Sequence, residues 1–178
     1  MNVLAISGSL RAVSSNTAVL HAAVLVAPPP MRVTLYTGLD TLPWFNPDRD
    51  GDDDIPAPVA ALRREVGAAD GVLISSPEYA HAIPGALKNA LEWLVRSPAM
   101  VGKPVALLNT SLMAAVAQAQ LVDVLGTMSA RVVPAACLTV PVSGRPRTPD
   151  EIATNGEYAS PLRAALRAFA SAIEGGSA

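Results

Sequence analysis

The sequence predicts an α/β fold: an open, doubly wound sandwich with a five-stranded parallel sheet in the order 2-1-3-4-5 and helices on both faces. Two observations lead to this prediction. Short apolar or β-branched segments alternate five times with segments whose apolar residues recur every three or four positions. In addition, segments such as GVLIS and PVALL are apolar throughout, which is typical of strands buried on both faces.

The elements follow in order along the chain. Segments bounded by Gly, Pro, Asp or Ser predict strands at residues 2–7, 31–36, 71–75, 104–109 and 132–138. Helical spacing predicts helices at about residues 15–27, 58–68, 84–95, 114–129 and 159–173. A chain of 178 residues without a clear linker predicts one domain, residues 1–178. In such sheets the ligand lies at the carboxyl ends of the strands, so the loops after the first, third and fourth strands are the candidate site.

Composition and charge argue against several classes of protein and function. With 51% hydrophobic and 16% charged residues, the chain is predicted to be globular rather than disordered. A net charge of −2 without a basic stripe argues against nucleic-acid binding. Apolar runs break well before ~20 residues and no leader pattern is evident, so we expect no membrane span and a cytoplasmic protein. Cys137 is the single cysteine, which excludes an intramolecular disulfide and predicts a small core residue.

The first loop, SGSLRAVSSN, has the composition of an anion site. Its polar side chains include Ser9, Arg11, Ser14, Ser15 and Asn16. The guanidinium and hydroxyl donors stand at the start of the first predicted helix, where free backbone N–H groups and the positive end of the helix dipole also meet. These are the donors that a phosphate monoester needs. In the alternative interpretation, Ser14 or Ser15 only caps the helix.

Other motifs do not fit the spacing. GSLRAV is not G-x-G-x-x-G, the chain contains no G-x-x-x-x-G-K-[ST], and Ser9 is not at the centre of G-x-S-x-G, so a dinucleotide fold, a P-loop and an α/β-hydrolase are disfavoured. The acidic run DRDGDDD at residues 48–54 has Asp53 and Val59 where an EF-hand needs Gly and Glu. We therefore expect a solvated surface loop there.

The third loop, SSPEYAHAIPGALKNALEW, has features that suit a flat ligand. Pro77 and Pro84 stiffen the loop, Gly85 lets a backbone come close, and Tyr79 offers an aromatic face with a polar tip. In the alternative interpretation, Tyr79 is a packed surface aromatic residue. Glu78 is predicted to be structural, because no second titratable group stands at a useful spacing.

Four further side chains are ambiguous from the sequence. His21 and His81 have no partner at metal or triad spacing, so both are predicted to be non-catalytic, although His81 lies in a loop that could touch a ligand. Trp44 and Phe45 form an apolar pair in a loop, which suits a core contact, a subunit contact or a ligand lid.

The motifs GSLRAVSSN, LPWFNPD and PEYAHAIPGALKNALEW, in this order, resemble the NADPH-dependent FMN reductase family, whose members are flavodoxin-like and include quinone, chromate and azo-dye reductases. The resemblance covers roughly residues 1–108 and implies a flavodoxin-like three-layer sandwich. It also implies that the first loop binds the phosphate of FMN, through Ser9, Arg11, Ser14, Ser15, Asn16 and Thr17. The PEY loop would line the isoalloxazine ring, through Pro77, Glu78, Tyr79, Ala80 and Ile83.

The chain departs from the family pattern in two loops. The usual PEYN is PEYA here, so Ala80 cannot supply a side-chain amide, and Ala82 replaces the usual serine. After the fourth strand the family has a glycine-bearing loop of the kind GASxGxxGG, whereas this chain reads NTSLMAAVAQAQ. Without glycine the backbone approaches a ring less freely. Asn109, Thr110 and Ser111 are the remaining candidates there.

The resemblance implies an activity in which the cofactor supplies the chemistry. NAD(P)H would pass a hydride to bound FMN, leave, and be replaced by a small acceptor such as a quinone, in a ping-pong cycle that needs no catalytic side chain. Free flavin, azo and nitro compounds and oxidised metal ions suit the same site. Two alternatives are a flavodoxin-like electron carrier and a flavin-free binding protein of the same fold. The resemblance also implies a homodimer or homotetramer, with Trp44, Phe45 and Trp93 as candidates for its interface. In the alternative interpretation, these three residues complete the core of the monomer.

Overall fold

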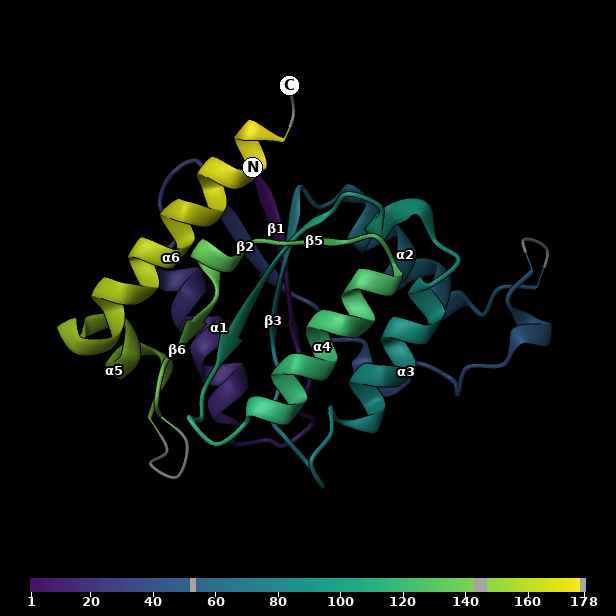
Figure 1. The fold of residues 1–178 in the computed structure, drawn as a ribbon, viewed down its shortest axis with the longest axis horizontal. Helices are drawn as coiled ribbons and strands as arrows, with labels where there is room; N and C mark the ends of the chain where they lie inside the picture. The colour runs from purple at the N-terminus through teal and green to yellow at the C-terminus, as the bar shows by residue number, and fades with distance from the viewer. Residues whose placement is uncertain (52–53, 143–146, 177–178) are drawn as a thin grey trace.

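The computed structural model describes residues 1–51, 54–142 and 147–176. A parallel sheet lies between two layers of helices (Figure 1). Its strands are β1 Asn2–Ser7, β2 Arg32–Leu35, β3 Gly71–Ser75, β4 Pro104–Asn109, β5 Arg131–Val132 and β6 Leu138–Thr139. The main path runs β2-β1-β3-β4-β5, and β6 also pairs with β4. The predicted flavodoxin-like fold and strand order are therefore confirmed.

The helices cover the two faces of the sheet in separate groups. They are α1 Ser15–Val26, α2 Ala57–Ala68, α3 Gly85–Leu94, α4 Ala115–Thr127, α5 Pro149–Thr154 and α6 Gly156–Gly175. One core packs α1, α5 and α6 on one face, and the other packs α2, α3 and α4 on the opposite face (Figure 1). In β3, Leu73 belongs to the first core, and its neighbours Val72 and Ile74 belong to the second. The strands are apolar throughout because both of their faces are buried.

The prediction of a single strand at 132–138 is wrong. Pro134 begins a short 3-10 turn, Pro134–Ala136, which separates two strands of two residues each. Proline has no N–H to donate to a sheet, so the ladder is interrupted there and β6 pairs with β4 one turn later.

Helix α5 was not among the predicted elements, although its start carries a sequence signal. Thr148 accepts a hydrogen bond from the Glu151 N–H at 3.2 Å, and Glu151 Oε2 accepts one from the Thr148 N–H at 2.7 Å. This reciprocal pair is a capping box, and Pro149 occupies the first helical position. The sequence T-P-D-E therefore marks the beginning of a helix.

The loop before the acidic run is fixed to α3. The Pro43 carbonyl accepts hydrogen bonds from Asn89 Nδ2 at 3.0 Å and Trp93 Nε1 at 2.8 Å. Phe45 packs edge-on against Trp93, with 5.0 Å between the ring centroids. Trp93 is fully buried and therefore cannot form a subunit surface, whereas Trp44 is 80% exposed.

The expectation of a solvated loop at 48–54 is wrong for Asp50. Its side chain is buried, and Oδ1 lies 2.5 Å from Nη2 of Arg63. Arg63 also donates to the Trp93 carbonyl, so this pair joins the loop to α2 and α3. The Asp50 carboxylate can be buried because the Arg63 guanidinium compensates its charge. The run of acidic residues by itself gives no sign of this pairing. Asp52 and Asp53 lie outside the described residues.

Cys137 is half-buried beside the core that packs α4, rather than fully inside it. Burial raises the pKa of its thiol, while the hydrogen bond from the Leu107 N–H lowers that pKa to a smaller extent. No helix in the described ranges is both long and apolar enough to cross a membrane.

Candidate functional site

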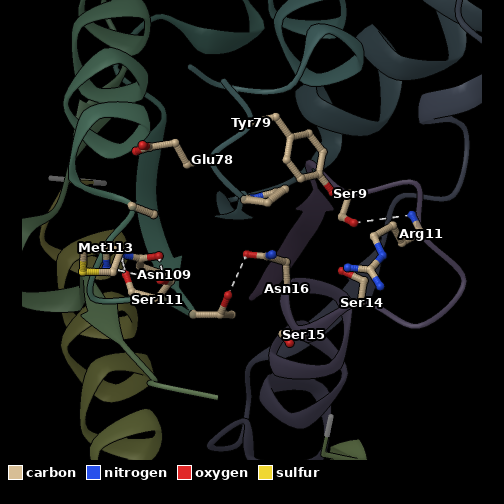
Figure 2. A pocket seen from close by; sticks show the side chains of 13 residues that line it. Ser9, Arg11, Ser14, Ser15, Asn16, Glu78, Tyr79, Asn109, Ser111 and Met113 are labelled. Atoms are coloured by element: carbon tan, nitrogen blue, oxygen red, sulfur yellow. Dashed lines mark hydrogen bonds between the residues drawn. The ribbon is translucent and has the colours of Figure 1, made fainter. Parts of the chain in front are cut away.

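A cavity of about 300 Å³ opens at the carboxyl ends of β1, β3 and β4 (Figure 2). Three loops and the start of two helices supply its walls. The described lining residues are Ser9, Arg11, Ser14, Ser15, Asn16, Pro77, Glu78, Tyr79, Asn109, Thr110, Ser111, Met113 and Ala114. The cavity lies where a doubly wound sheet binds its ligand, outside the strand ends. We call it the inner cavity.

The first loop leaves the sheet at a glycine that has no room for a side chain. The Gly8 N–H donates to the Ser75 carbonyl at 2.8 Å, which ties the end of β1 to the end of β3. A Cβ at Gly8 would lie 2.8 Å from Ser76 Oγ and 3.0 Å from Leu87 Cδ2, within the van der Waals radii of both atoms. This close packing directs the chain from Ser9 onward around the edge of the cavity.

The first loop and α1 present hydrogen-bond donors to the inner cavity. Ser14 is the N-cap of α1, and its Oγ accepts from the Thr17 N–H at 3.3 Å, so capping and cavity lining are combined in one residue. The N–H groups of Ser15 and Asn16, in the first helical turn, have no acceptor within the helix. The Arg11 guanidinium forms no ion pair with any described residue.

Asn16 connects the three loops. Its Oδ1 accepts from Ser75 Oγ at 2.9 Å and Thr110 Oγ1 at 3.4 Å, and its side chain is buried. The acceptor of the amide is therefore used inside the protein, which fixes the orientation of the group and leaves its N–H donors for the cavity. Together with Arg11 and the α1 dipole, these donors make this end of the cavity suitable for an anion.

The third loop forms a two-residue hairpin beside the cavity. The N–H and carbonyl of Tyr79 both pair with those of Ala82, at 3.0 Å each. The two residues at the tip have positive φ values, 51° for Ala80 and 57° for His81. This is the geometry of a type I′ turn, in which Asn and Gly are favoured, so alanine and histidine are strained there. Tyr79 remains 46% exposed, with its ring at the cavity (Figure 2).

Glu78 joins the third loop to α4. The N-cap position of α4 is Ala114, which has no side-chain acceptor, and Glu78 Oε2 accepts from the Ala117 N–H at 2.9 Å instead. Glu78 Oε1 also lies 3.3 Å from His81 Nδ1. The structural role predicted for Glu78 agrees with this contact. However, the statement that it has no titratable partner is wrong, because the hairpin brings His81 to it.

The fourth loop makes its turn without glycine. Asn109 Nδ2 donates to the Ser111 carbonyl at 2.6 Å, and Asn109 Oδ1 accepts from the Ser111 N–H at 3.1 Å. Ser111 in turn accepts from the N–H groups of Met113, at 3.2 Å, and Ala114, at 3.4 Å. No residue of this loop has a positive φ. Side-chain acceptors thus take the N–H groups of Ser111 and Met113 in place of a glycine turn, and the Ser111 backbone carbonyl takes that of Ala114, so three N–H groups are used inside the protein.

The structure brings together all but three of the sequence-predicted site residues. Thr17 Oγ1 lies 2.8 Å from Ser7 Oγ below the cavity, Ala80 lies at the hairpin tip, and Ile83 is buried in the core. Met113 and Ala114 line the cavity but were not predicted. Both residues follow β4 closely, and this position is a signal that the sequence contains. Because the fourth loop lacks the family's glycines, the sequence prediction for this loop stopped at Ser111. Gly85 starts α3, and no atom from elsewhere in the protein lies within 4 Å of the position that a Cβ would occupy.

The donor set and shape of the inner cavity fit FMN. The end formed by the first loop has donors and, among the described lining residues, no carboxylate, which suits a phosphate. The lining also includes Pro77, the Tyr79 ring and the exposed Met113 side chain, which suit a flat ring. Glu78 is the one carboxylate in the described lining, and it is bound to α4.

Comparisons with known proteins agree with this arrangement. The model of a family described as NADPH-dependent FMN reductase matches residues 1–144. A quinone reductase from Escherichia coli K12 is 38% identical over 122 residues, which cover 67% of this chain and 64% of that protein. An NAD(P)H-dependent FMN reductase from Pseudomonas aeruginosa is 40% identical over 113 residues, 62% of this chain and 60% of that protein. The matches thus span less than two thirds of these relatives.

A solved structure is similar over almost the whole chain. The flavoenzyme FerB from Paracoccus denitrificans, an NAD(P)H:(acceptor) oxidoreductase, superimposes with a TM-score of 0.75 at 28% identity. The alignment covers 98% of this chain and 97% of FerB.

Proposed function

The chain belongs to the NADPH-dependent FMN reductase family, a family of oxidoreductases, and from this membership we propose that it is an NAD(P)H-dependent reductase that binds FMN and reduces a small acceptor such as a quinone. The observation that carries the proposal is the inner cavity, whose lining combines the hydrogen-bond donors of the first loop with the Tyr79 ring, Pro77 and Met113. We take residues 1–178 to act as one FMN-binding domain, since both cores share a single sheet.

Each wall of the cavity has a separate task in this proposal. Arg11, the hydroxyls of the first loop and the N–H groups at the start of α1 would hold the FMN phosphate. Pro77, Tyr79 and Met113 would lie against the ring and exclude water from part of it. Bound FMN would supply the redox chemistry by accepting a hydride from NAD(P)H and passing electrons to the acceptor in a ping-pong cycle.

The protein's own contribution is to position and tune, not to transfer protons. Glu78, the carboxylate in the described lining, is occupied by the Ala117 N–H, and its neighbour His81 does not line the cavity. Because the fourth loop uses the N–H groups of Ser111, Met113 and Ala114 internally, few of its donors are left for the ring. Such donors stabilise negative charge on a reduced ring, so we expect a lower flavin potential than a loop rich in free N–H groups would give.

The proposal is tested by loading and turnover. The protein is mixed with FMN and desalted, its absorbance is recorded, and NADPH and then a quinone are added without oxygen. We expect flavin absorbance that is retained, bleached by NADPH and restored by quinone. A protein that keeps FMN but is not bleached by NADPH would be an electron carrier, and one that keeps no FMN would be a flavin-free binding protein. Either result would overturn the reductase proposal.

The Arg11→Ala variant tests the phosphate end. A charge-assisted contact contributes about 1.5–3 kcal/mol, so FMN affinity should fall roughly ten- to hundredfold. Riboflavin, which lacks the phosphate, should bind both proteins equally. Arg64→Ala, a change at an exposed arginine of α2 outside the cavity, is the matched control and should leave both affinities unchanged. An equal loss of FMN and riboflavin affinity would contradict the phosphate role.

Self-association is also proposed for this chain. Trp44 is 80% exposed although the residues on either side of it are hydrogen-bonded to Asn89, and Leu112 and Met113 are 77% and 86% exposed. A large aromatic side chain held in water by a fixed loop suits a contact between copies. Light scattering should give the mass of a homodimer or homotetramer, and Trp44→Ser should shift it toward the monomer.

A further inference from the structure

A second cavity, of about 500 Å³, adjoins the inner one, and we call it the outer cavity. It lies where the start of α5 meets α1, and it shares Arg11, Ser14 and Ser15 with the inner cavity. The three shared residues are among those that would hold the FMN phosphate. Nothing in the proposed mechanism uses the outer cavity.

The outer cavity carries positive charge that the described protein does not balance. Arg11, His21 and Arg147 line it, and none of them forms an ion pair with a described carboxylate. The nearest acidic residues along the chain are Asp150 and Glu151, which are exposed, and the Glu151 carboxylate is bound to the Thr148 N–H in the capping box. Two of the three cationic groups of this wall are arginines, whose guanidinium is always charged in proteins.

Arg147 is held in place rather than free in solvent. Its guanidinium carbon lies 5.1 Å from the centroid of the Tyr158 ring, and Tyr158 is buried in α6. The Arg147 Nε is buried and has no hydrogen-bond acceptor among the described residues. Because this nitrogen is buried, a ligand in the cavity would meet the rest of the guanidinium, whose planar fork of donors suits a phosphate.

The cavity is too large for one phosphate alone and is partly apolar. Val13, Ala18 and Pro149 contribute apolar surface beside the cationic groups. This combination suits a sugar and a flat base joined to a phosphate. Because the outer cavity adjoins the proposed flavin site, a single ligand could extend across both. One half of that ligand would lie in or against the inner cavity, and the other half would occupy the outer cavity.

We propose that the outer cavity binds the adenosine phosphate of a dinucleotide, with Arg147 and His21 as its specificity residues. The inference rests on the proposed function. Two sources of such a group are compared: NADPH, whose adenosine carries a 2′-phosphate that NADH lacks, and FAD, whose AMP half extends beyond the phosphate shared with FMN. Both present the same chemistry to Arg147, and they are separated by experiment.

Binding of 2′,5′-ADP to the FMN-loaded protein tests the site without turnover. By calorimetry we expect measurable binding to the wild type, and affinity roughly ten- to hundredfold lower in Arg147→Gln. His21→Gln, a change on an exposed position of α1, should weaken binding in the same direction and serves as a second variant if Arg147→Gln disturbs the start of α5. Arg167→Gln, a change at an exposed arginine of α6 outside the cavity, is the matched control and should bind like the wild type.

Two further measurements show which dinucleotide, NADPH or FAD, supplies the adenosine phosphate. If the ligand is NADPH, Arg147→Gln raises the KM for NADPH at least tenfold and leaves that for NADH unchanged. If it is FAD, Arg147→Gln weakens FAD binding to the apoprotein and leaves FMN binding unchanged. The proposal would be overturned if 2′,5′-ADP did not bind, or if the wild type and both variants bound it equally. It would also be overturned if Arg147→Gln changed neither the KM for NADPH nor the affinity for FAD. Retention of FMN by the wild type in the same samples shows separately whether the proposed function holds.

Discussion

Single residues decide the shape of the inner cavity where the backbone has the least freedom. Gly8 has no space for a Cβ, so it fixes the point at which the first loop leaves the sheet. At the hairpin of the third loop the opposite situation holds, because Ala80 and His81 occupy the left-handed region without being glycine. A left-handed residue with a side chain costs roughly 1–2 kcal/mol. The hydrogen bonds of Tyr79 with Ala82 and the contact of His81 with Glu78 offset part of that cost.

We predict that Ala80→Gly stabilises the protein. Removing the Cβ at a φ of 51° relieves strain, so the free energy of unfolding should rise by up to about 1 kcal/mol, measured by urea denaturation. Ala82→Gly is the matched control, because Ala82 has no positive φ and pairs with Tyr79. It should lower the free energy of unfolding by about 0.5–1 kcal/mol. Stabilisation by both changes would contradict the strain argument.

At the scale of elements, α4 depends on a residue from another loop for its start. Its first turn has N–H groups to satisfy and no capping side chain of its own. Glu78 supplies the acceptor from the third loop, and Gln120 Oε1 accepts from the Ile83 N–H at 3.2 Å in the same region. These two hydrogen bonds join the third loop to α4 beside the inner cavity.

Glu78→Ala should loosen the start of α4. Loss of a capping acceptor costs about 0.5–2 kcal/mol, so the Ala117 amide should exchange with deuterium faster while amides near the end of α4 stay unchanged. Glu78→Gln keeps an acceptor oxygen and should restore most of the protection. If Ala117 exchanged equally in all three proteins, the cap would contribute nothing in solution.

At the scale of the whole molecule, the sheet gathers three loops at one edge, and every one of them is needed for the inner cavity. Asn16 binds Ser75 and Thr110, so the loops after β1, β3 and β4 are connected even without a ligand. A ligand that contacts all three would stabilise the folded chain and not the unfolded one. Ligand binding and global stability are therefore linked.

FMN should raise the melting temperature in a concentration-dependent way. At one hundred times the dissociation constant, the added stability is about 2.7 kcal/mol, which corresponds to a shift of roughly 5–10 °C for a domain of this size. Riboflavin should give a smaller shift because it cannot use the Arg11 end of the cavity. A melting temperature that does not depend on FMN, measured by near-ultraviolet circular dichroism, would contradict binding to the inner cavity.

Much of this architecture could be predicted from local pattern. The bounds of β1, β3 and β4 agree with the prediction to the residue, because each is an apolar run ended by a turn former and buried on both faces. The strand predicted at 132–138 failed because Pro134 interrupts a segment that is otherwise apolar. Thr17, Ala80 and Ile83 were placed in the site by their position in a motif, whereas side-chain direction decides which residues line a cavity.

By itself, the sequence determined the layered fold, the strand order and the loops that form the inner cavity, because period and burial of apolar residues are local properties. Only the tertiary structure decided how distant segments meet: Asp50 is buried against Arg63, Glu78 caps α4, and Arg147, which precedes α5, lines the same cavity as Arg11. Such contacts depend on three-dimensional packing and on the cost of leaving a buried charge or donor without a partner, and no spacing along the chain encodes them.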